Sequence, residues 1–201
     1  MDMDADFFRR WLEAVADSVG EEAARLTELD SPIGDADHGS NLQRGFTSVR
    51  SALGQETPET PGAVLMLAGR TLVSTVGGAS GPLYGTLLRR TGKALGNAPR
   101  ATPEQLRAAL AEGVAAVAQL GGSAAGDKTM LDALEPAVEA LADGPRAAAD
   151  AALRGAEATA PMQARKGRAS YLGERSVGHR DPGAASSALL MAALAEVSAD
   201  E

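Results

Sequence analysis

The sequence predicts an all-α protein, and two features of the 201-residue chain support this. Alanine and leucine are abundant, whereas strand-favouring residues are few and aromatic residues make up only 3% of the chain. Apolar residues recur every three or four positions almost throughout, which is the spacing of amphipathic helices. Short connections between successive helices make neighbours antiparallel. We therefore expect a single domain, residues 1–201, of eight antiparallel amphipathic helices.

The helix boundaries follow from the apolar spacing and from the residues that start each helix. Thr60 and Pro61 are suited to an N-cap and a first turn, and Thr102 with Gln105 forms a capping box. No segment is predicted as a strand. The expected helices span about 8–30, 38–53, 61–76, 80–95, 103–120, 127–141, 146–163 and 183–197.

The charge and the cysteine count exclude several classes of protein. The chain has 19 basic and 27 acidic residues, a net charge of −8, whereas nucleic-acid and acidic-membrane partners require a basic face. It has no cysteine, which excludes disulfides, zinc thiolate sites and cysteine nucleophiles. No apolar run is expected to reach the length of a membrane span, and the acidic start is unlike a signal peptide. We expect a cytoplasmic protein with no nucleic-acid and no membrane partner.

The most unusual stretch is "DSPIGDADHGSN", residues 30–41, at the end of the first expected helix. Asp30, Asp35 and Asp37 fall within eight residues, and carboxylates this close repel unless something compensates them. Such a set suits a hard divalent cation such as Mg²⁺, which often shares its coordination with phosphates. The alternative is a set of N-caps and turn formers. An EF-hand fails, because the twelfth position counted from Asp35 is Phe46 and not glutamate.

Two glycine-rich segments also break the helical pattern. The first, "VGGASGPLYGT" at 76–86, opens a helix, so its backbone N–H groups could hold an anion; it could equally be a simple turn. The second, "GGSAAGDKTM" at 121–130, nearly imitates a Walker loop. However, Asp127 separates Gly126 from Lys128, and the preceding segment is helical. This second loop could bind a nucleotide base or stabilise a helix start.

A long basic connection, 164–187, lies before the last expected helix. It could hold a phosphate between a metal ion and an arginine, or it could pair with acidic helix faces as a solvated loop. Its basic residues are Arg165, Lys166, Arg168, Arg175 and Arg180. All of these unusual connections follow odd-numbered helices, and in an up-and-down array such connections lie at the same end. Neither His38 nor His179 is expected to act as a covalent nucleophile.

Four motifs together resemble a known family. "LDSPIGDADHGSNLQRGF", "VGGASGPLYGT", "GDKTMLDAL" and "MQARKGRASYLGERSVGHRDPGAAS" occur in that order, and the match covers essentially the whole chain. They resemble the ADP-binding L-subunit family of bacterial dihydroxyacetone kinases, commonly called DhaL. The resemblance implies a closed barrel of eight antiparallel helices with ADP and two Mg²⁺ ions at one end.

The resemblance also implies roles for individual residues. Asp30, Asp35 and Asp37 would coordinate the two Mg²⁺ ions. The expected nucleotide contacts are His38, Gly39, Ser40, Asn41, Ala79, Ser80, Gly121, Gly122, Thr129, Met130, Arg168, Asp181, Pro182 and Gly183.

The family further implies partners and a reaction. In its phosphotransferase-system-dependent members, ADP stays bound as a cofactor and is rephosphorylated to ATP by a phosphohistidine on subunit M. The γ-phosphoryl group then passes to dihydroxyacetone on subunit K. Phosphoryl transfer needs mainly positioning and charge neutralisation, so no covalent residue is required in this chain.

Three alternatives remain open from the sequence. An ATP-dependent dihydroxyacetone or ketose kinase subunit would use ATP as an exchanging substrate. A nucleotide-loaded protein could regulate transcription through a partner regulator. A bare helical scaffold would bind no ligand at all.

Overall fold

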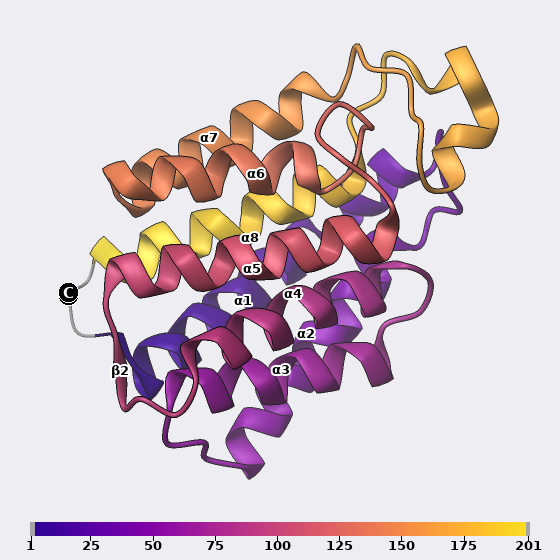
Figure 1. Ribbon diagram of the computed structural model, residues 1–201. Helices are drawn as coiled ribbons and strands as arrows, with labels where there is room; N and C mark the ends of the chain where they lie inside the picture. The colour runs from indigo at the N-terminus through magenta and orange to yellow at the C-terminus, as the bar shows by residue number, and fades with distance from the viewer. Residues whose placement is uncertain (1–2, 200–201) are drawn as a thin grey trace.

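The computed structural model describes residues 3–199, and its helices run back and forth across the molecule (Figure 1). Within that range the all-α class is confirmed, with one very short pair of strands added. The elements in chain order are β1 (Met3–Asp4), α1 (Ala5–Asp30), α2 (His38–Gln55), α3 (Pro61–Thr75), α4 (Ser80–Leu95), β2 (Arg100–Ala101), α5 (Pro103–Gly121), α6 (Leu131–Ala140), η1 (Leu141–Asp143), α7 (Pro145–Ala158), η2 (Arg168–Ser176) and α8 (Pro182–Ala199).

Each α-helix packs against the next one along the chain, and α8 packs against both α7 and α1. The contacts between successive helices therefore run from α1 to α8 and back to α1. The regular geometry of a closed barrel stays a prediction. Phe7, Phe8 and Trp11 of α1 lie in the main core, where they are inaccessible to solvent. The indole N–H of Trp11 donates to the backbone oxygen of Leu190 at 2.9 Å, which satisfies this buried donor and ties α1 to α8.

The two helix N-caps that the sequence predicts, at Thr60 and Thr102, are confirmed in detail. The Thr60 hydroxyl accepts a hydrogen bond from the amide of Ala63, with Pro61 in the first turn. Thr102 and Gln105 exchange the two reciprocal bonds of a capping box. Both caps satisfy amides that have no partner inside the helix, so they fix where α3 and α5 begin.

Three boundaries differ from the sequence prediction by three residues or more, and a further element was not predicted. The first helix begins at Ala5, because Asp4 caps it through the amide of Phe7. The sixth begins at Leu131 rather than 127, and the seventh ends at Ala158 rather than 163. The 3₁₀ segment η2 was not predicted, because poor helical periodicity there indicates a loop.

A short antiparallel pair of strands, β1 and β2, also contradicts the expectation of no strand. Met3 pairs with Ala101 and Asp4 with Arg100, which ties the start of α1 to the connection between α4 and α5. Two residues per strand are too few to produce a detectable alternation of apolar and polar residues.

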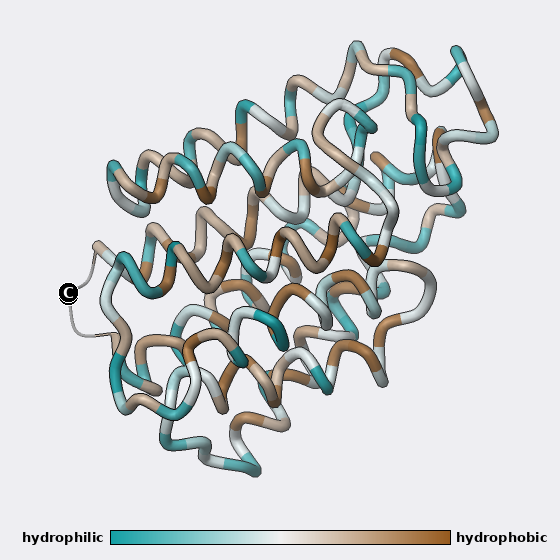
Figure 2. The backbone as a smooth tube through the Cα atoms, in the orientation of Figure 1, coloured by the Kyte–Doolittle hydropathy of each residue, from teal (hydrophilic) through white to brown (hydrophobic). Residues whose placement is uncertain are grey.

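Helix α8 is long and apolar enough, by length and composition, to cross a membrane, contrary to the expectation from sequence. Its 18 residues have a mean hydropathy of 1.2, and 56% of them are buried in the structure. Figure 2 shows α8 as a largely pale to brown segment lying among the other helices. Because α7 and α1 cover it, we assign α8 to the protein core, whose helices pass the same test.

Candidate functional site

A cavity of about 430 Å³ opens at the end of the bundle where α1, α3, α5 and α7 finish. Residues from four connections line it, namely 30–37, 76–79, 122–130 and 159–181. We call the last of these, which includes η2, the arm. Figure 1 shows all four connections at the same end of the molecule, at the right of the view. The prediction that the unusual connections gather at one end is therefore confirmed.

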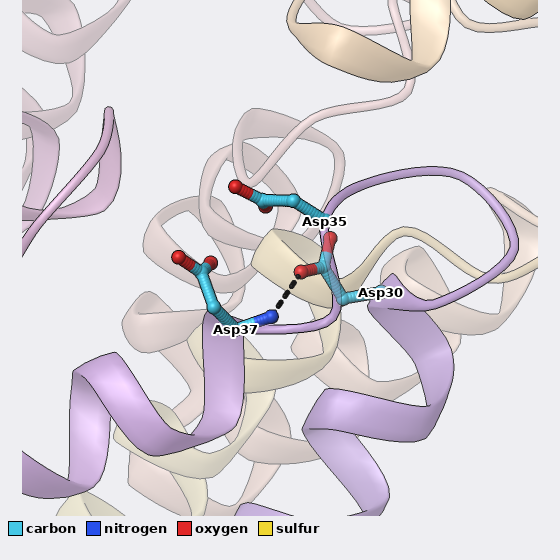
Figure 3. Close-up of side chains that lie close together, drawn as sticks. All are labelled: Asp30, Asp35 and Asp37. Atoms are coloured by element: carbon cyan, nitrogen blue, oxygen red, sulfur yellow. Dashed lines mark hydrogen bonds between the residues drawn. The ribbon is translucent and has the colours of Figure 1, made fainter.

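Three carboxylates meet on one side of this cavity (Figure 3). One oxygen each from Asp30, Asp35 and Asp37 lies within 4.8 Å of the others, although Asp30 is buried and Asp35 is exposed. Uncompensated carboxylates at this separation repel one another. A hard divalent cation supplies the missing charge and prefers oxygen ligands, so this donor set fits Mg²⁺.

The backbone around the carboxylates is built to hold Asp30 in place. One Asp30 oxygen, Oδ2, accepts hydrogen bonds from the amides of Asp37 (3.0 Å) and His38 (3.2 Å) and so caps the start of α2. A Cβ atom at Gly34 would lie 1.9 Å from the other Asp30 oxygen, so only glycine fits there. Ala36 has φ +58°, a left-handed conformation that costs energy for a residue with a side chain. This turn, residues 30–37, is thus strained and brings the three carboxylates together. We call it the aspartate turn.

The arm contacts the aspartate turn through an ion pair and an apolar cluster. The Arg168 guanidinium donates to Asp35 at 2.6 Å, with side chains 67% and 38% exposed. Beneath this pair, Ile33 is buried against Ala164 and Ala169 of the arm. Arg168 therefore partly compensates the carboxylates, and it lies at the cavity where it could also contact an anion.

A buried polar network connects the start of α2, which follows the aspartate turn, to the start of α4, which follows the glycine-rich connection 76–79. His38 contacts the Ser80 hydroxyl through Nδ1 (3.1 Å) and the Ser186 hydroxyl through Nε2 (2.9 Å). The Tyr84 hydroxyl lies 2.7 Å from that of Ser186 and 3.0 Å from that of Ser187. Burial lowers the pKa of His38, although the nearby carboxylates Asp30 and Asp37 oppose this. Both ring nitrogens are engaged, so a neutral His38 can orient Ser80 at the cavity.

The connection 122–130 is folded by a carboxylate that follows it. Asp132, in the first turn of α6, accepts hydrogen bonds from the amides of Gly126 (2.5 Å) and Thr129 (2.7 Å). Thr129 and Met130 then lie against the cavity. Asp132 therefore orders this loop, and the two roles that its sequence suggested, binding a base and stabilising a helix start, stay predictions.

The residue before α8 contributes a further, partly buried carboxylate to the cavity. Asp181 accepts a hydrogen bond from the amide of Ala184 at 2.7 Å and so caps this helix. Burial raises the pKa of Asp181 to about 7, an effect that Asp132 increases and Lys128 opposes. The pKa of Asp181 therefore lies well above that of an ordinary carboxylic acid.

Most of the metal and nucleotide contacts that the resemblance implies line this one cavity, and three do not. Gly39 packs against α1, where a Cβ atom would lie 1.9 Å from the backbone oxygen of Ala23. Ser40 is exposed and donates to the backbone oxygen of Asp37, and Gly122 ends α5 with φ +55°. The lining residues are Asp30, Asp35, Asp37, His38, Asn41, Ala79, Ser80, Gly121, Thr129, Met130, Arg168, Asp181, Pro182 and Gly183.

Sequence reasoning missed part of the lining. The sequence predicts no individual contact for Leu83, Val117 and Leu120, which form an apolar wall. Lys128 and Lys166 lie in loops that the sequence singles out, but without a predicted contact of their own, and they also reach the cavity. The helical spacing does place Val117 and Leu120 on the apolar face of their helix. It does not reveal that this face continues beyond the core, where Leu120 is 54% exposed.

Comparison with known proteins identifies the family. The DAK2 domain family matches residues 32–196. The chain belongs to the DAK2 domain family. Among its relatives is the "PEP-dependent dihydroxyacetone kinase 1, ADP-binding subunit DhaL" of Listeria innocua, 44% identical over 196 residues. This alignment covers 96% of the chain and 97% of the relative.

Two further DAK2 relatives agree with this one. The ADP-binding subunit DhaL of the Escherichia coli PEP-dependent dihydroxyacetone kinase is 44% identical, over 92% of the chain and 93% of the relative. The crystal structure of the dihydroxyacetone kinase from C. freundii in complex with AMP-PNP and Mg²⁺ superposes with a TM-score of 0.77 at 29% identity. The match covers 98% of this chain but 34% of that longer one.

Proposed function

We propose that this chain is the nucleotide-binding subunit of a phosphoenolpyruvate-dependent dihydroxyacetone kinase, a phosphotransferase active only with its partner subunits. ADP is its tightly bound cofactor. A partner phosphorylates it to ATP, and ATP then transfers its γ-phosphoryl group to dihydroxyacetone, which leaves ADP on the subunit. The observation that carries the proposal is the convergence of Asp30, Asp35 and Asp37 on a cavity that Arg168 also lines. The relatives with 44% identity over nearly the full length support it.

The aspartate turn would hold the metal. Its three carboxylates would hold two Mg²⁺ ions, because Mg²⁺ takes carboxylate ligands together with water and substrate phosphates. When bound, these ions neutralise charge on the phosphates during transfer. Asp30, fixed by two backbone amides, is positioned before any ion arrives.

The remaining lining residues would bind the nucleotide. Ala79 and Ser80 begin α4, where the helix dipole and free amides favour a phosphate. Leu83, Val117 and Leu120 offer an apolar wall suited to a base. The full set of proposed nucleotide contacts is His38, Gly39, Ser40, Asn41, Ala79, Ser80, Gly121, Gly122, Thr129, Met130, Arg168, Asp181, Pro182 and Gly183.

The chain's own contribution to transfer is positioning and charge. Arg168 would exchange its ion pair with Asp35 for a contact to phosphate oxygens, where a guanidinium binds two oxygens at once. The open end of the cavity would face the two proposed protein partners in turn, in the cytoplasm. These are a phosphohistidine-carrying subunit M and a dihydroxyacetone-binding subunit K, and a transcription regulator would be a further partner.

Reconstitution tests this function. The chain is combined with subunits K and M, the phosphoenolpyruvate-dependent phosphoryl carriers and Mg²⁺, and dihydroxyacetone phosphate is measured. We expect product from the wild type and at least 100-fold less from Asp35→Asn, whereas Asp150→Asn on the surface of α7 behaves as the wild type. Absence of product from the wild type, or full activity of Asp35→Asn, would contradict the proposal.

A further inference from the structure

Lys128 is the most unusual residue near the cavity that the proposed function leaves without a role. Its side chain is only 1% exposed, although a lysine is rarely buried to this extent. Its backbone has φ +64°, which is uncommon for any residue other than glycine. A buried charge on a strained backbone needs specific partners to persist.

The partners of Lys128 are three backbone oxygens of the arm. Its ammonium group donates to Ser176 (2.8 Å), Met162 (3.0 Å) and Ala160 (3.4 Å). An ammonium group has three N–H donors, so none remains for a phosphate in this arrangement. Lys128 therefore differs from the phosphate-binding lysine of a Walker loop, despite its glycine-rich surroundings.

These three oxygens lie on both sides of η2. Ala160 and Met162 precede η2 and Ser176 ends it. A single side chain therefore joins the two segments of the arm that flank η2. Neighbouring backbone bonds complete the junction: Arg165 donates to the Asp127 oxygen at 3.1 Å, and Gly178 donates to that of Ala160 at 2.8 Å. These contacts hold the two ends of the arm together next to the cavity. We call this junction the base of the arm.

We infer that Lys128 is a positioning residue that closes the base of the arm and thereby sets where Arg168 lies relative to the aspartate turn. The arm reaches that turn through the Arg168–Asp35 pair and the packing of Ile33 against Ala164. An arm that opens at its base loses both contacts. The part of the inference that concerns nucleotide affinity rests on the proposed function, whereas the part that concerns the closure of the arm does not.

The absence of cysteine from the chain allows a sharp test. Lys128→Cys can be alkylated at one position in denaturant and refolded. Aminoethylation of the thiol creates a lysine analogue with sulfur in the side chain, and propylation creates an uncharged chain of similar length. The matched control is Lys93→Cys, treated identically, at an exposed position in the last turn of α4.

Amide hydrogen exchange is measured by NMR for Ala164, Arg165 and Gly178, whose amides donate within the arm or at its base. We expect exchange at least 10-fold faster in Lys128→Cys and in its propylated form, with the amides of α1–α5 unchanged. Aminoethylation should restore the slow exchange. The affinity for Mg·ADP should fall at least 10-fold in Lys128→Cys and in its propylated form. Aminoethylation should restore this affinity.

Two results would overturn the inference. The first is arm exchange in Lys128→Cys at the wild-type rate while α1–α5 remain protected. The second is equal restoration by propyl and aminoethyl groups, because it would show that the side chain only fills space. If Lys128→Cys does not fold, Lys128→Met, which has no donor and a similar length, replaces it, and wild-type exchange there equally contradicts the inference.

The two proposals fail in distinguishable ways. A wild-type chain that binds no Mg·ADP contradicts the proposed function, while charge-dependent exchange in the arm would still support the role of Lys128. Conversely, a wild type that binds Mg·ADP with an arm indifferent to Lys128 contradicts only the inference.

Discussion

Arg168 of the arm forms an ion pair with Asp35, one of three converging carboxylates, at 2.6 Å. The pair joins two segments that are more than a hundred residues apart in the sequence. The ion pair also competes with metal binding, because a carboxylate bound to a guanidinium is less available to a metal ion. Loading the site with Mg²⁺ and a phosphate would let each group take a better partner.

The first prediction concerns Arg168→Gln. The ion pair is largely exposed, so its loss should change the free energy of unfolding by less than about 1 kcal/mol. Affinity for Mg·ADP should fall at least about 10-fold, because charge-assisted contacts to phosphate are strong. Thermal denaturation and calorimetric titration measure the two effects separately. A variant that loses stability but keeps its nucleotide affinity would contradict this role.

The second prediction separates Asp30 from Asp35. Asp30→Ala should destabilise the metal-free protein by about 1–3 kcal/mol, because one buried and one partly buried amide lose their acceptor. Asp35→Ala should leave its stability nearly unchanged, since that side chain is exposed. Denaturant titration in the presence of a chelator measures both. Equal effects of the two substitutions would show that Asp30 does not hold the turn.

The third prediction concerns Gly34→Ala. The added methyl group would meet the Asp30 carboxylate, so it should displace a metal ligand and weaken Mg²⁺ binding at least about 10-fold. The matched substitution is Gly54→Ala in α2, where a Cβ atom has nothing within 4 Å. That change should instead stabilise the helix by about 0.5–1 kcal/mol. Unaltered Mg²⁺ affinity in Gly34→Ala would count against the aspartate turn as a metal site.

The fourth prediction concerns pH. Burial raises the pKa of Asp181 from 3.8 to about 7, so the folded state holds this proton more tightly than the unfolded state does. The resulting stability is complete below about pH 4 and is lost as the pH rises through about 7. Relative to Asp181→Asn, the wild type should therefore lose up to about 4 kcal/mol between these values.

Denaturant unfolding with a chelator, at several pH values, checks this difference. Comparing the two proteins cancels the opposite contribution of His38, whose lowered pKa favours the folded state as the pH rises. A difference that does not change with pH would mean that Asp181 titrates as an ordinary carboxylic acid.

The sequence predicts the helices and the end of the bundle that carries the site because both follow from local patterns. Apolar spacing and caps such as Thr102 with Gln105 act over a few residues. The Arg168–Asp35 pair and the network from Ser80 to Ser187 depend on tertiary contacts, which leave no periodic signal. Lys128 is the clearest case, because nothing in "GDKTM" reveals that its partners lie more than thirty residues later.

The central claim is that the aspartate turn and its cavity hold a resident Mg·ADP. The most direct measurement purifies the protein without added nucleotide, denatures it, and identifies the released nucleotide and metal by chromatography and mass spectrometry. We predict one ADP per chain with Mg²⁺, exchanging slowly against labelled ATP. Empty protein that binds and exchanges ATP readily would contradict the resident cofactor, and protein that binds no nucleotide would contradict the site itself.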